Sequence, residues 1–388
     1  MDPQLLFNLR KFLVPEIVYG EGALGLAGRH AINMGAQKPF IISDPGVSES
    51  GWTAKVEQSL VEAGLPFVTF LEVSPNPKDY QVMAGAELYR QEQCDLILAV
   101  GGGSPMDLAK GVGVVANNGG HITDYEGVDE ISSPVPPLIF IPTTAGTSAD
   151  VSQFAIISDT SREVKIAIVS KMVIPDLALV DPATTVTMSP ELTAATGMDA
   201  LCHAFEAYVS TASSPLTDMA AEKAVALVAE NLRGAFAQPA NMYYRQNMMM
   251  ASLMAGLAFS NASLGLVHAM AHSLGGLKNL PHGECNGLLL EHVVRFNAPH
   301  VDGKYQQLGR AMGLVLDEFS EGNDIEIVVE AISALRKDLQ IVQTLGEMGV
   351  NRSDLAKLAQ FASQDPCLAT NPREAGTSEI ETIYLQIY

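Results

Sequence analysis

Two pairs of residues with metal-binding side chains occur in the second half of the sequence, each with the spacing of one helical turn. Asp199 and His203 are four residues apart in the stretch GMDALCHAFEAY, and His268 and His272 are four apart in VHAMAHSLGG. On a helix this spacing puts both side chains of a pair on one face, within reach of a single ion. A further imidazole, His282, follows in a Pro-His-Gly-Glu segment that we expect to be a turn.

The number of these groups favours a metal site. A single histidine on an apolar helix is more often a structural residue than a ligand. Here, however, one carboxylate and four imidazoles fall between positions 199 and 282 of a chain that has 8 histidines. Three nitrogen ligands and one oxygen suit Fe(II) or Zn(II), and spacing does not choose between the two ions. Nor does spacing identify which imidazole stays off the metal, where it could relay protons.

A glycine-rich segment in the first half could hold a phosphate. Gly102, Gly103 and Ser104 lie between an apolar strand-like run, DLILAV, and a helix-like run in which we expect Pro105 to be the first helical residue. Glycines let the backbone approach a phosphate, and the start of a helix offers free N–H groups. Met106 replaces the third glycine of the full GxGxxG fingerprint, so the segment alone is equally typical of a tight turn.

Two further polar clusters follow strand-like runs. Thr143, Thr144 and Thr147 come after PLIFIP, where hydroxyl groups suit phosphate or ribose contacts but could also cap the next segment. Asp44 ends the strand-like run in ISDPG. Its carboxylate could accept hydrogen bonds from ribose hydroxyls and would repel a 2′-phosphate, or it could simply form a turn. Together with the glycine segment, these clusters predict a dinucleotide site that prefers NAD to NADP.

The two halves of the chain have different periodicity. Strand candidates are 39–44, 66–73, 95–102 and 137–144, and helix candidates between them are 52–64, 79–93 and 105–116. This alternation predicts a parallel sheet covered by helices, the Rossmann-like α/β class. Strand-like pieces continue through 151–190, and helical periodicity takes over from about Pro190. We expect an α/β dinucleotide-binding domain at 1–188, an all-helical metal-binding domain at 189–388, and the active site in the cleft between them.

Composition excludes several classes of function. A formal charge of −21 argues against nucleic acid and anionic membranes as partners. Four cysteines without CxxC spacing, and an N-terminus without a signal-peptide pattern, predict a cytoplasmic protein. The stretch 246–277 carries no charged residue, but its Asn, Ser, Gly and His residues predict a buried helix rather than a membrane span.

The motifs together resemble those of the iron-containing (group III) alcohol dehydrogenase family. The matching pieces are GGGSPMDLAKG, PTTAGTSADVS, GMDALCHAFEAYVS, GLVHAMAHSLGG, PHGECNG and DPCLATNPR, which extend over nearly the whole chain. The resemblance implies the dehydroquinate synthase-like fold, with an α/β nucleotide-binding domain followed by a helical metal-binding domain.

The resemblance also implies which of the five candidate side chains bind the metal and which imidazole does not. The implied ligands of Fe(II), or of Zn(II) in its place, are Asp199, His203, His268 and His282. His272 would then line the active site as a proton-relay group.

Contacts to NAD are implied in the same way. Asp44 and Asn76 would meet the adenosine end, and Lys165 would lie near the nicotinamide. The implied pyrophosphate contacts are Gly102, Gly103 and Ser104, with Thr143, Thr144 and Thr147 beside them.

The resemblance thus implies a metal-dependent, NAD-linked enzyme that interconverts small primary alcohols or diols and aldehydes by hydride transfer. A homo-oligomer, dimer or larger, is expected. Three alternatives stay open: a hydroxyacid–oxoacid transhydrogenase, a glycerol dehydrogenase-like enzyme, and a non-catalytic nucleotide- or metal-binding protein. The sequence does not name the alcohol.

Overall fold

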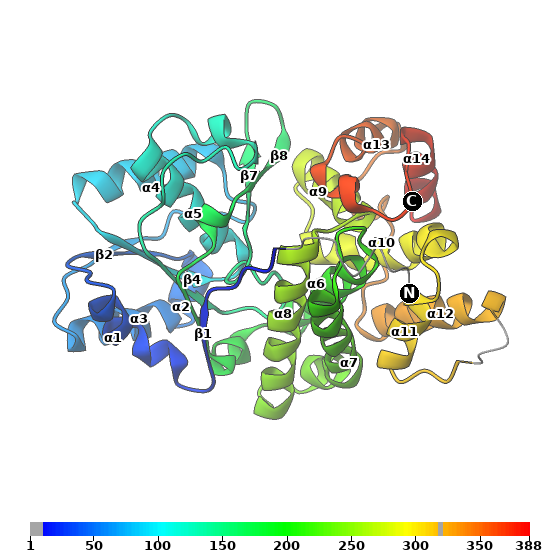
Figure 1. Ribbon diagram of the computed structural model, residues 1–388, viewed down its shortest axis with the longest axis horizontal. Helices are drawn as coiled ribbons and strands as arrows, with labels where there is room; N and C mark the ends of the chain where they lie inside the picture. Colours follow the sequence, from blue (N-terminus) through cyan, green and yellow to red (C-terminus); the bar gives the residue numbers. More distant parts are fainter. Residues whose placement is uncertain (1–10, 317–320) are drawn as a thin grey trace.

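The chain folds into a sheet-containing part and a helical part that lie side by side (Figure 1). The structure is a computed structural model that describes residues 11–316 and 321–388. Residues 1–10, which belong to the segment without a signal-peptide pattern, lie outside the described residues.

Six parallel strands form the central sheet of the first part, in the order β1-β9-β6-β4-β2-β3. Their bounds are β1 Glu16–Tyr19, β2 Pro39–Ile42, β3 Val68–Phe70, β4 Leu96–Gly101, β6 Leu138–Pro142 and β9 Leu177–Val180. The four strands expected between residues 39 and 144 are present, and the expected parallel α/β sheet is confirmed. Strand β1 was not expected, because its four residues are too few and too exposed to give a clear apolar run.

Helices cover both faces of this sheet. Their bounds are α1 Ala27–Asn33, α2 Pro45–Glu49, α3 Trp52–Glu62, α4 Asp79–Gln91 and α5 Gly103–Asn118. Alternate residues of β4 enter different cores: Leu96 and Leu98 pack with side chains of α1 and α3, whereas Ile97 and Ala99 pack with those of α4 and α5. Because both faces are buried, the strand is apolar along its whole length.

A second, smaller sheet contains β5 Gly127–Val128, β7 Phe154–Asp159 and β8 Val164–Val169, in the order β5-β8-β7. From the sequence we expected β7 and β8 to belong to the first domain, but not to form a separate sheet. The two strands form an antiparallel hairpin. The buried carboxylate of Asp159 holds its turn, accepting hydrogen bonds from the backbone N–H groups of Ser161 and Arg162 and from the Arg162 guanidinium. This hairpin carries Lys165.

We expect Asp159→Asn to lower the free energy of unfolding by about 1–2 kcal/mol at pH 7, because the amide cannot accept all of these hydrogen bonds. The hydrogen bonds lower the pKa of Asp159 although burial alone would raise it. Its stabilising effect is therefore complete above the unfolded pKa of about 4 and is lost as pH falls. Urea unfolding at pH 7 and at progressively lower pH measures this. Glu163→Gln, at an exposed carboxylate of the same turn, is the control. Equal stability of Asp159→Asn and wild type at pH 7 would contradict the prediction.

Beyond residue 190, every regular element of the described residues is helical. The bounds are α6 Pro190–Val209, α7 Pro215–Ala237, α8 Met242–Ala262, α9 Leu266–Lys278, α10 His282–Asn297, α11 Lys304–Ala311, α12 Glu321–Asp338, α13 Leu355–Ala362 and α14 Thr377–Gln386. Helix α6 is central: all residues from 193 to 209 are buried, and it packs against α7, α8 and α10. Close packing requires small residues, since a Cβ at Gly197 would lie 2.2 Å from Leu232 Cδ1.

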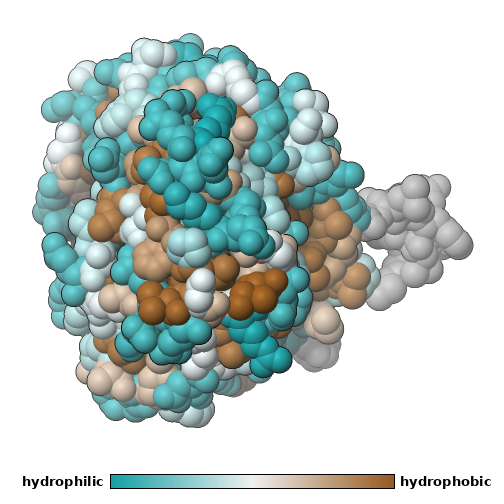
Figure 2. Space-filling view, turned by 90° about the vertical axis from the view of Figure 1, so that its left-hand side faces the viewer, coloured by the Kyte–Doolittle hydropathy of each residue, from teal (hydrophilic) through white to brown (hydrophobic). Residues whose placement is uncertain are grey.

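The charge-free stretch 246–277 falls within two helices, α8 and α9, rather than the single buried helix expected. They are bent by 100° at their junction, and most of their side chains are buried. No single helix of the described residues is long and apolar enough to cross a membrane. The bent pair α8 and α9, taken together, has the length and the apolar composition of a membrane span. All four cysteines are buried free thiols. The face formed by the sheet-containing part is largely hydrophilic, with separate hydrophobic patches (Figure 2).

Candidate metal and cofactor site

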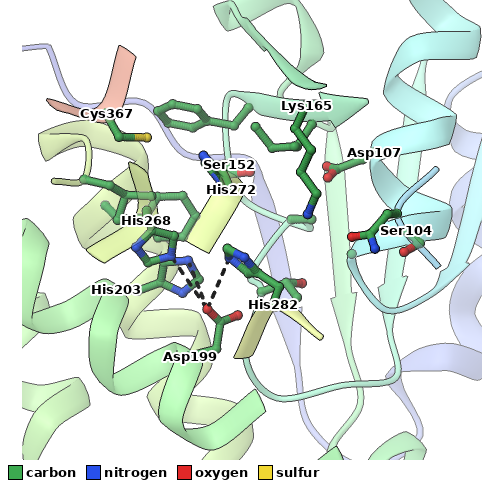
Figure 3. A pocket seen from close by; sticks show the side chains of 18 of the residues that line it. Ser104, Asp107, Ser152, Lys165, Asp199, His203, His268, His272, His282 and Cys367 are labelled. Atoms are coloured by element: carbon green, nitrogen blue, oxygen red, sulfur yellow. Dashed lines mark ion pairs between the residues drawn. The ribbon is translucent and has the colours of Figure 1, made fainter. Parts of the chain in front are cut away.

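Four of the metal-binding side chains expected from the sequence lie together beside a cavity (Figure 3). Ligand atoms of Asp199, His268 and His282 lie within 4.8 Å of one another, and the ring of His203 stacks on that of His268. We call these four residues the metal-type cluster. Oδ1 of Asp199 lies 3.8 Å from Nε2 of His203, 3.6 Å from Nε2 of His268 and 3.7 Å from Nε2 of His282. Asp199 and His203 share one face of α6, as their spacing predicts. His282 does not lie in a turn as expected: it is the first residue of α10.

The second ring nitrogen of each imidazole decides how these rings are oriented. His203 Nδ1 donates to the carbonyl oxygen of Gly146 at 3.2 Å, and His268 Nδ1 lies 2.5 Å from Oε2 of Glu206. His282 Nδ1 is buried without a hydrogen-bond partner. Holding Nδ1 as the donor leaves the Nε2 lone pairs of His203 and His268 free to face Asp199. A donor set of three such nitrogens and one carboxylate oxygen fits a divalent transition metal.

The charges of this cluster are strongly coupled. Burial alone would raise the pKa of Asp199, but the imidazoles of His203, His268 and His282 hold it far below its usual range. Burial lowers the pKa of His203 to about 4 and that of His282 well below its ordinary value. Burial would also lower the pKa of His268, but Glu206 and Asp199 outweigh it and raise that pKa to about 9. The ionised carboxylate and the neutral imidazoles of His203 and His282 are in the state that a cation requires, whereas His268 would release a proton on binding one.

Asn286 is a member of the cluster that sequence reasoning missed. Its Nδ2 donates to Oδ1 of Asp199 at 2.7 Å and lies 3.2 Å from Nε2 of both His268 and His282. It is fully buried on α10, one helical turn after His282. The spacing of four residues in PHGECN could have identified it by the rule that identified the two other pairs.

His272 is held by a carboxylate that lies outside the metal-type cluster. Its Nδ1 lies 2.9 Å from Oδ2 of Asp365, and its ring stacks on that of His282 with centroids 5.4 Å apart. Asp365 also caps the 3-10 helix η8, Pro366–Thr370, by accepting from the N–H of Cys367. The sequence motif DPCLATNPR contains both of these residues, but reasoning from the sequence assigned them no role.

The predicted cofactor residues line two adjoining cavities. The cavity at the metal-type cluster has a volume of about 170 Å³, and a second cavity of about 650 Å³ extends toward Asp44. Gly103, Ser104 and Thr147 line both cavities, so the two cavities adjoin at these residues. We call the two adjoining cavities together the cofactor channel. Further predicted residues that line the outer cavity are Asp44, Gly102, Thr143 and Thr144.

The glycine segment packs against the threonine segment without room for side chains. A Cβ on Gly102 would lie 3.1 Å from Thr144 Cγ2, and a Cβ on Gly103 would lie 3.1 Å from Thr147 Cγ2. Helix α5 begins at Gly103, so Pro105 is its third residue and not its first as expected. The first N–H groups of a helix have no intrahelical partner, so the channel passes a site suited to a phosphate.

Asn76, which the resemblance assigns to the adenosine end of NAD, lies nearer the metal side. It lines the metal-side cavity, and its Nδ2 donates to Oδ1 of Asn279, at the end of α9, at 2.7 Å. Asp44 lines the outer cavity together with Ser74 and Pro75, the two residues before Asn76. The assignment of Asn76 and Asp44 to the adenosine end of NAD stays a prediction.

Comparisons with known proteins agree with this geometry. The family model described as "Iron-containing alcohol dehydrogenase" matches residues 15–182, and that described as "Fe-containing alcohol dehydrogenase family, C-terminal" matches residues 193–388. The chain belongs to the iron-containing alcohol dehydrogenase family.

Relatives of this iron-containing alcohol dehydrogenase cover it nearly end to end. It is 40% identical to 1,3-propanediol dehydrogenase of Citrobacter freundii over 98% of this chain and 100% of that one. It is 38% identical to NAD-dependent methanol dehydrogenase of Bacillus methanolicus, over 96% and 98% of the two chains. A crystal structure of 1,3-propanediol oxidoreductase has a TM-score of 0.95 at 40% identity, covering 98% of this chain and 100% of that one.

The rest of the metal-side cavity of this family member is lined mostly by apolar groups. Its walls come from separate segments: β7, α8, the α8–α9 junction and η8. The residues concerned are Phe154, Ile156, Phe259, Leu264 and Cys367.

Lys165 faces the same cavity from β8, near Asp107 of α5 (Figure 3). Burial lowers the pKa of Lys165 to about 8, and burial raises that of Asp107 to about 6 although two lysines oppose this shift. An amine held in an environment that disfavours its charge reduces stability, which is typical of a functional rather than a structural group.

We expect Lys165→Met to raise the melting temperature at pH 7 by roughly 2 °C, because it removes a charged amine from a half-buried position that disfavours its charge. The folded pKa is lowered, so wild type should gain stability relative to the variant as pH rises from about 8 to about 10. Thermal unfolding at pH 7 and pH 10 measures both effects. Lys171→Met, at an exposed lysine beyond the end of the same strand, is the control. A lower melting temperature for Lys165→Met at pH 7 would contradict the prediction.

Proposed function

We propose that the protein is a metal-dependent, NAD-linked dehydrogenase that interconverts small primary alcohols or diols and the corresponding aldehydes. The observation that carries this proposal is the convergence of Asp199 and three imidazole Nε2 atoms at one end of a channel whose other end passes the glycine segment of α5. Metal chemistry and cofactor binding thus have separate but adjoining positions. The metal-side cavity of about 170 Å³ suits a small substrate.

The proposed metal ligands are Asp199, His203, His268 and His282. The donor set suits Fe(II), the ion in the family's name, and also accommodates Zn(II). A bound divalent ion would act as a Lewis acid that lowers the pKa of the alcohol hydroxyl.

The chain's own groups would position the reactants. Backbone N–H groups at the start of α5, with the hydroxyls of Ser104 and Thr147, would bind the pyrophosphate of NAD. The apolar walls around Phe154 and Phe259 would bind the carbon chain and exclude water. His272, with its Nδ1 held by Asp365, would accept or release a proton at Nε2.

We expect His268→Ala to lose bound metal and to reduce turnover at least about 100-fold, because one of four ligands is removed. The assay is NADH absorbance with a panel of primary alcohols and aldehydes, on metal-stripped protein refilled with Fe(II) under anaerobic conditions or with Zn(II). His300→Ala, at an exposed histidine outside the cavity, should retain wild-type metal content and turnover.

Wild-type metal content and turnover in His268→Ala would refute the ligand assignment. If wild-type protein holds metal and cofactor yet oxidises no alcohol with free NAD, the dehydrogenase proposal fails. Hydride exchange between a hydroxyacid and an oxoacid would then indicate a transhydrogenase, and no reaction at all would indicate a binding protein.

Asp44 should set the preference for NAD over NADP. Its Oδ1 caps α2 by accepting from the N–H of Val47 at 2.9 Å, so a substitution can act through the cap or through the charge. Asp44→Ser keeps a capping hydroxyl and removes the charge, whereas Asp44→Gly removes both. In both variants we expect the kcat/KM for NADP, divided by the kcat/KM for NAD, to rise about tenfold, equivalent to about 1.4 kcal/mol. A ratio unchanged in both variants would remove Asp44 from cofactor selection.

We further propose a cytoplasmic homo-oligomer, dimer or larger, with the division between its two domains at residues 188 and 189. The last strand of the sheet, β9, ends at Val180 and α6 begins at Pro190, which supports this division. Closed symmetric assembly is the common case for soluble enzymes. Light scattering on the purified protein measures the number of subunits.

A further inference from the structure

The carboxylate of Glu206 lies behind the metal-type cluster, against the ring of His268. Glu206 lies on α6, three residues after His203, and only 4% of it is exposed. Its two oxygens have different partners on α9: Oε2 lies 2.5 Å from Nδ1 of His268, and Oε1 accepts from the N–H of Val267 at 2.6 Å. One side chain thus holds both the imidazole and the backbone that carries it.

The start of α9 is shaped to admit this contact. The helix has no capping side chain of its own, because its N-cap residue is Gly265. Asn371 Oδ1 accepts from the N–H of Leu266 at 3.1 Å, as Glu206 does from the next N–H. A Cβ on Gly265 would lie 2.7 Å from Asn371 Oδ1 and 3.1 Å from Glu206 Oε1. A negative charge at the first turn of a helix is also favourable for the helix dipole.

The Glu206 contact decides which nitrogen of His268 can bind a cation. The hydrogen bond to Glu206 occupies His268 Nδ1, so Nε2 is the ring nitrogen left to bind a cation. That Nε2 faces Asp199 Oδ1 at 3.6 Å. His203 has only the carbonyl oxygen of Gly146 behind it, and His282 Nδ1 has no partner. Among these three rings of the described structure, His268 alone is supported by a carboxylate.

We propose that Glu206 is a positioning residue that fixes the tautomer and orientation of His268 and thereby sets how tightly the metal is held. This inference rests on the proposed function, because it takes His268 to be a ligand. A carboxylate on the far side of a ligating imidazole makes the ring a better donor, and its loss typically costs 10–100-fold in metal affinity.

The test is Glu206→Gln, which preserves the volume of the side chain. It replaces one of the two accepting oxygens by an NH₂ group, so either Val267 N–H or His268 Nδ1–H would face a donor. We expect affinity for Zn(II) or Co(II), measured on the full-length protein by competition with a chelator, to fall about 10–100-fold. The visible absorption spectrum of the Co(II) form should also shift. Glu191→Gln, an exposed position at the start of the same helix, should change neither value.

Affinity and Co(II) spectrum unchanged in Glu206→Gln would overturn the proposal, even if its stability fell. The proposed function would survive that result, since it depends on metal loss and reduced turnover in His268→Ala.

A measurement on the wild-type protein tests the proposal even if Glu206→Gln fails to fold. Nitrogen NMR of histidine-labelled Zn(II) protein should show His268 protonated at Nδ1, with a proton that exchanges slowly with water. Protonation at Nε2 would overturn the proposal.

Discussion

A buried carboxylate that must remain ionised constrains much of this structure. Asp199 is 2% exposed, and a charge in such a place is stable only with close, well-oriented partners. Three imidazoles and the amide of Asn286 supply them. They come from α6, α9 and α10, so these three helices can pack only where their polar groups meet. The close packing of α6, with glycine or alanine at many positions, is what brings its neighbours near enough.

The cluster is also tied to the sheet. The loop between β6 and β7 accepts from His203 through the carbonyl oxygen of Gly146, and in the same loop Ser148 Oγ donates to the carbonyl oxygen of Ser252 on α8 at 2.6 Å. A Cβ at Gly146 would lie 2.5 Å from the carbonyl oxygen of Thr196, so the loop lies directly on α6. The threonines that face the cofactor channel belong to this segment. Cofactor side and metal side are thus positioned relative to each other by one short stretch of chain.

Local periodicity in the sequence predicted the inner strands of the sheet and the paired metal-binding residues. Apolar runs located the inner strands because both faces of the sheet are buried, and the spacing of four residues located Asp199 with His203. The partners behind the ligands could not be found in this way. Glu206 and His268 are separated by 62 positions, and His272 and Asp365 by 93. Only the tertiary fold brings them together. The positions of Pro105 and His282 were wrong for a smaller reason: helices α5 and α10 each begin earlier than their turn-like residues suggested.

The division of labour around the metal-side cavity has an evolutionary consequence. The metal-type groups lie on helices that are almost entirely buried, where a change of one methyl group disturbs several neighbours. The apolar walls, in contrast, come from a hairpin strand, a helix junction and a short 3-10 helix. Single substitutions there can alter the size and shape of the pocket while the frame stays intact. Such an architecture lets substrate preference diverge within one lineage faster than the chemistry it serves.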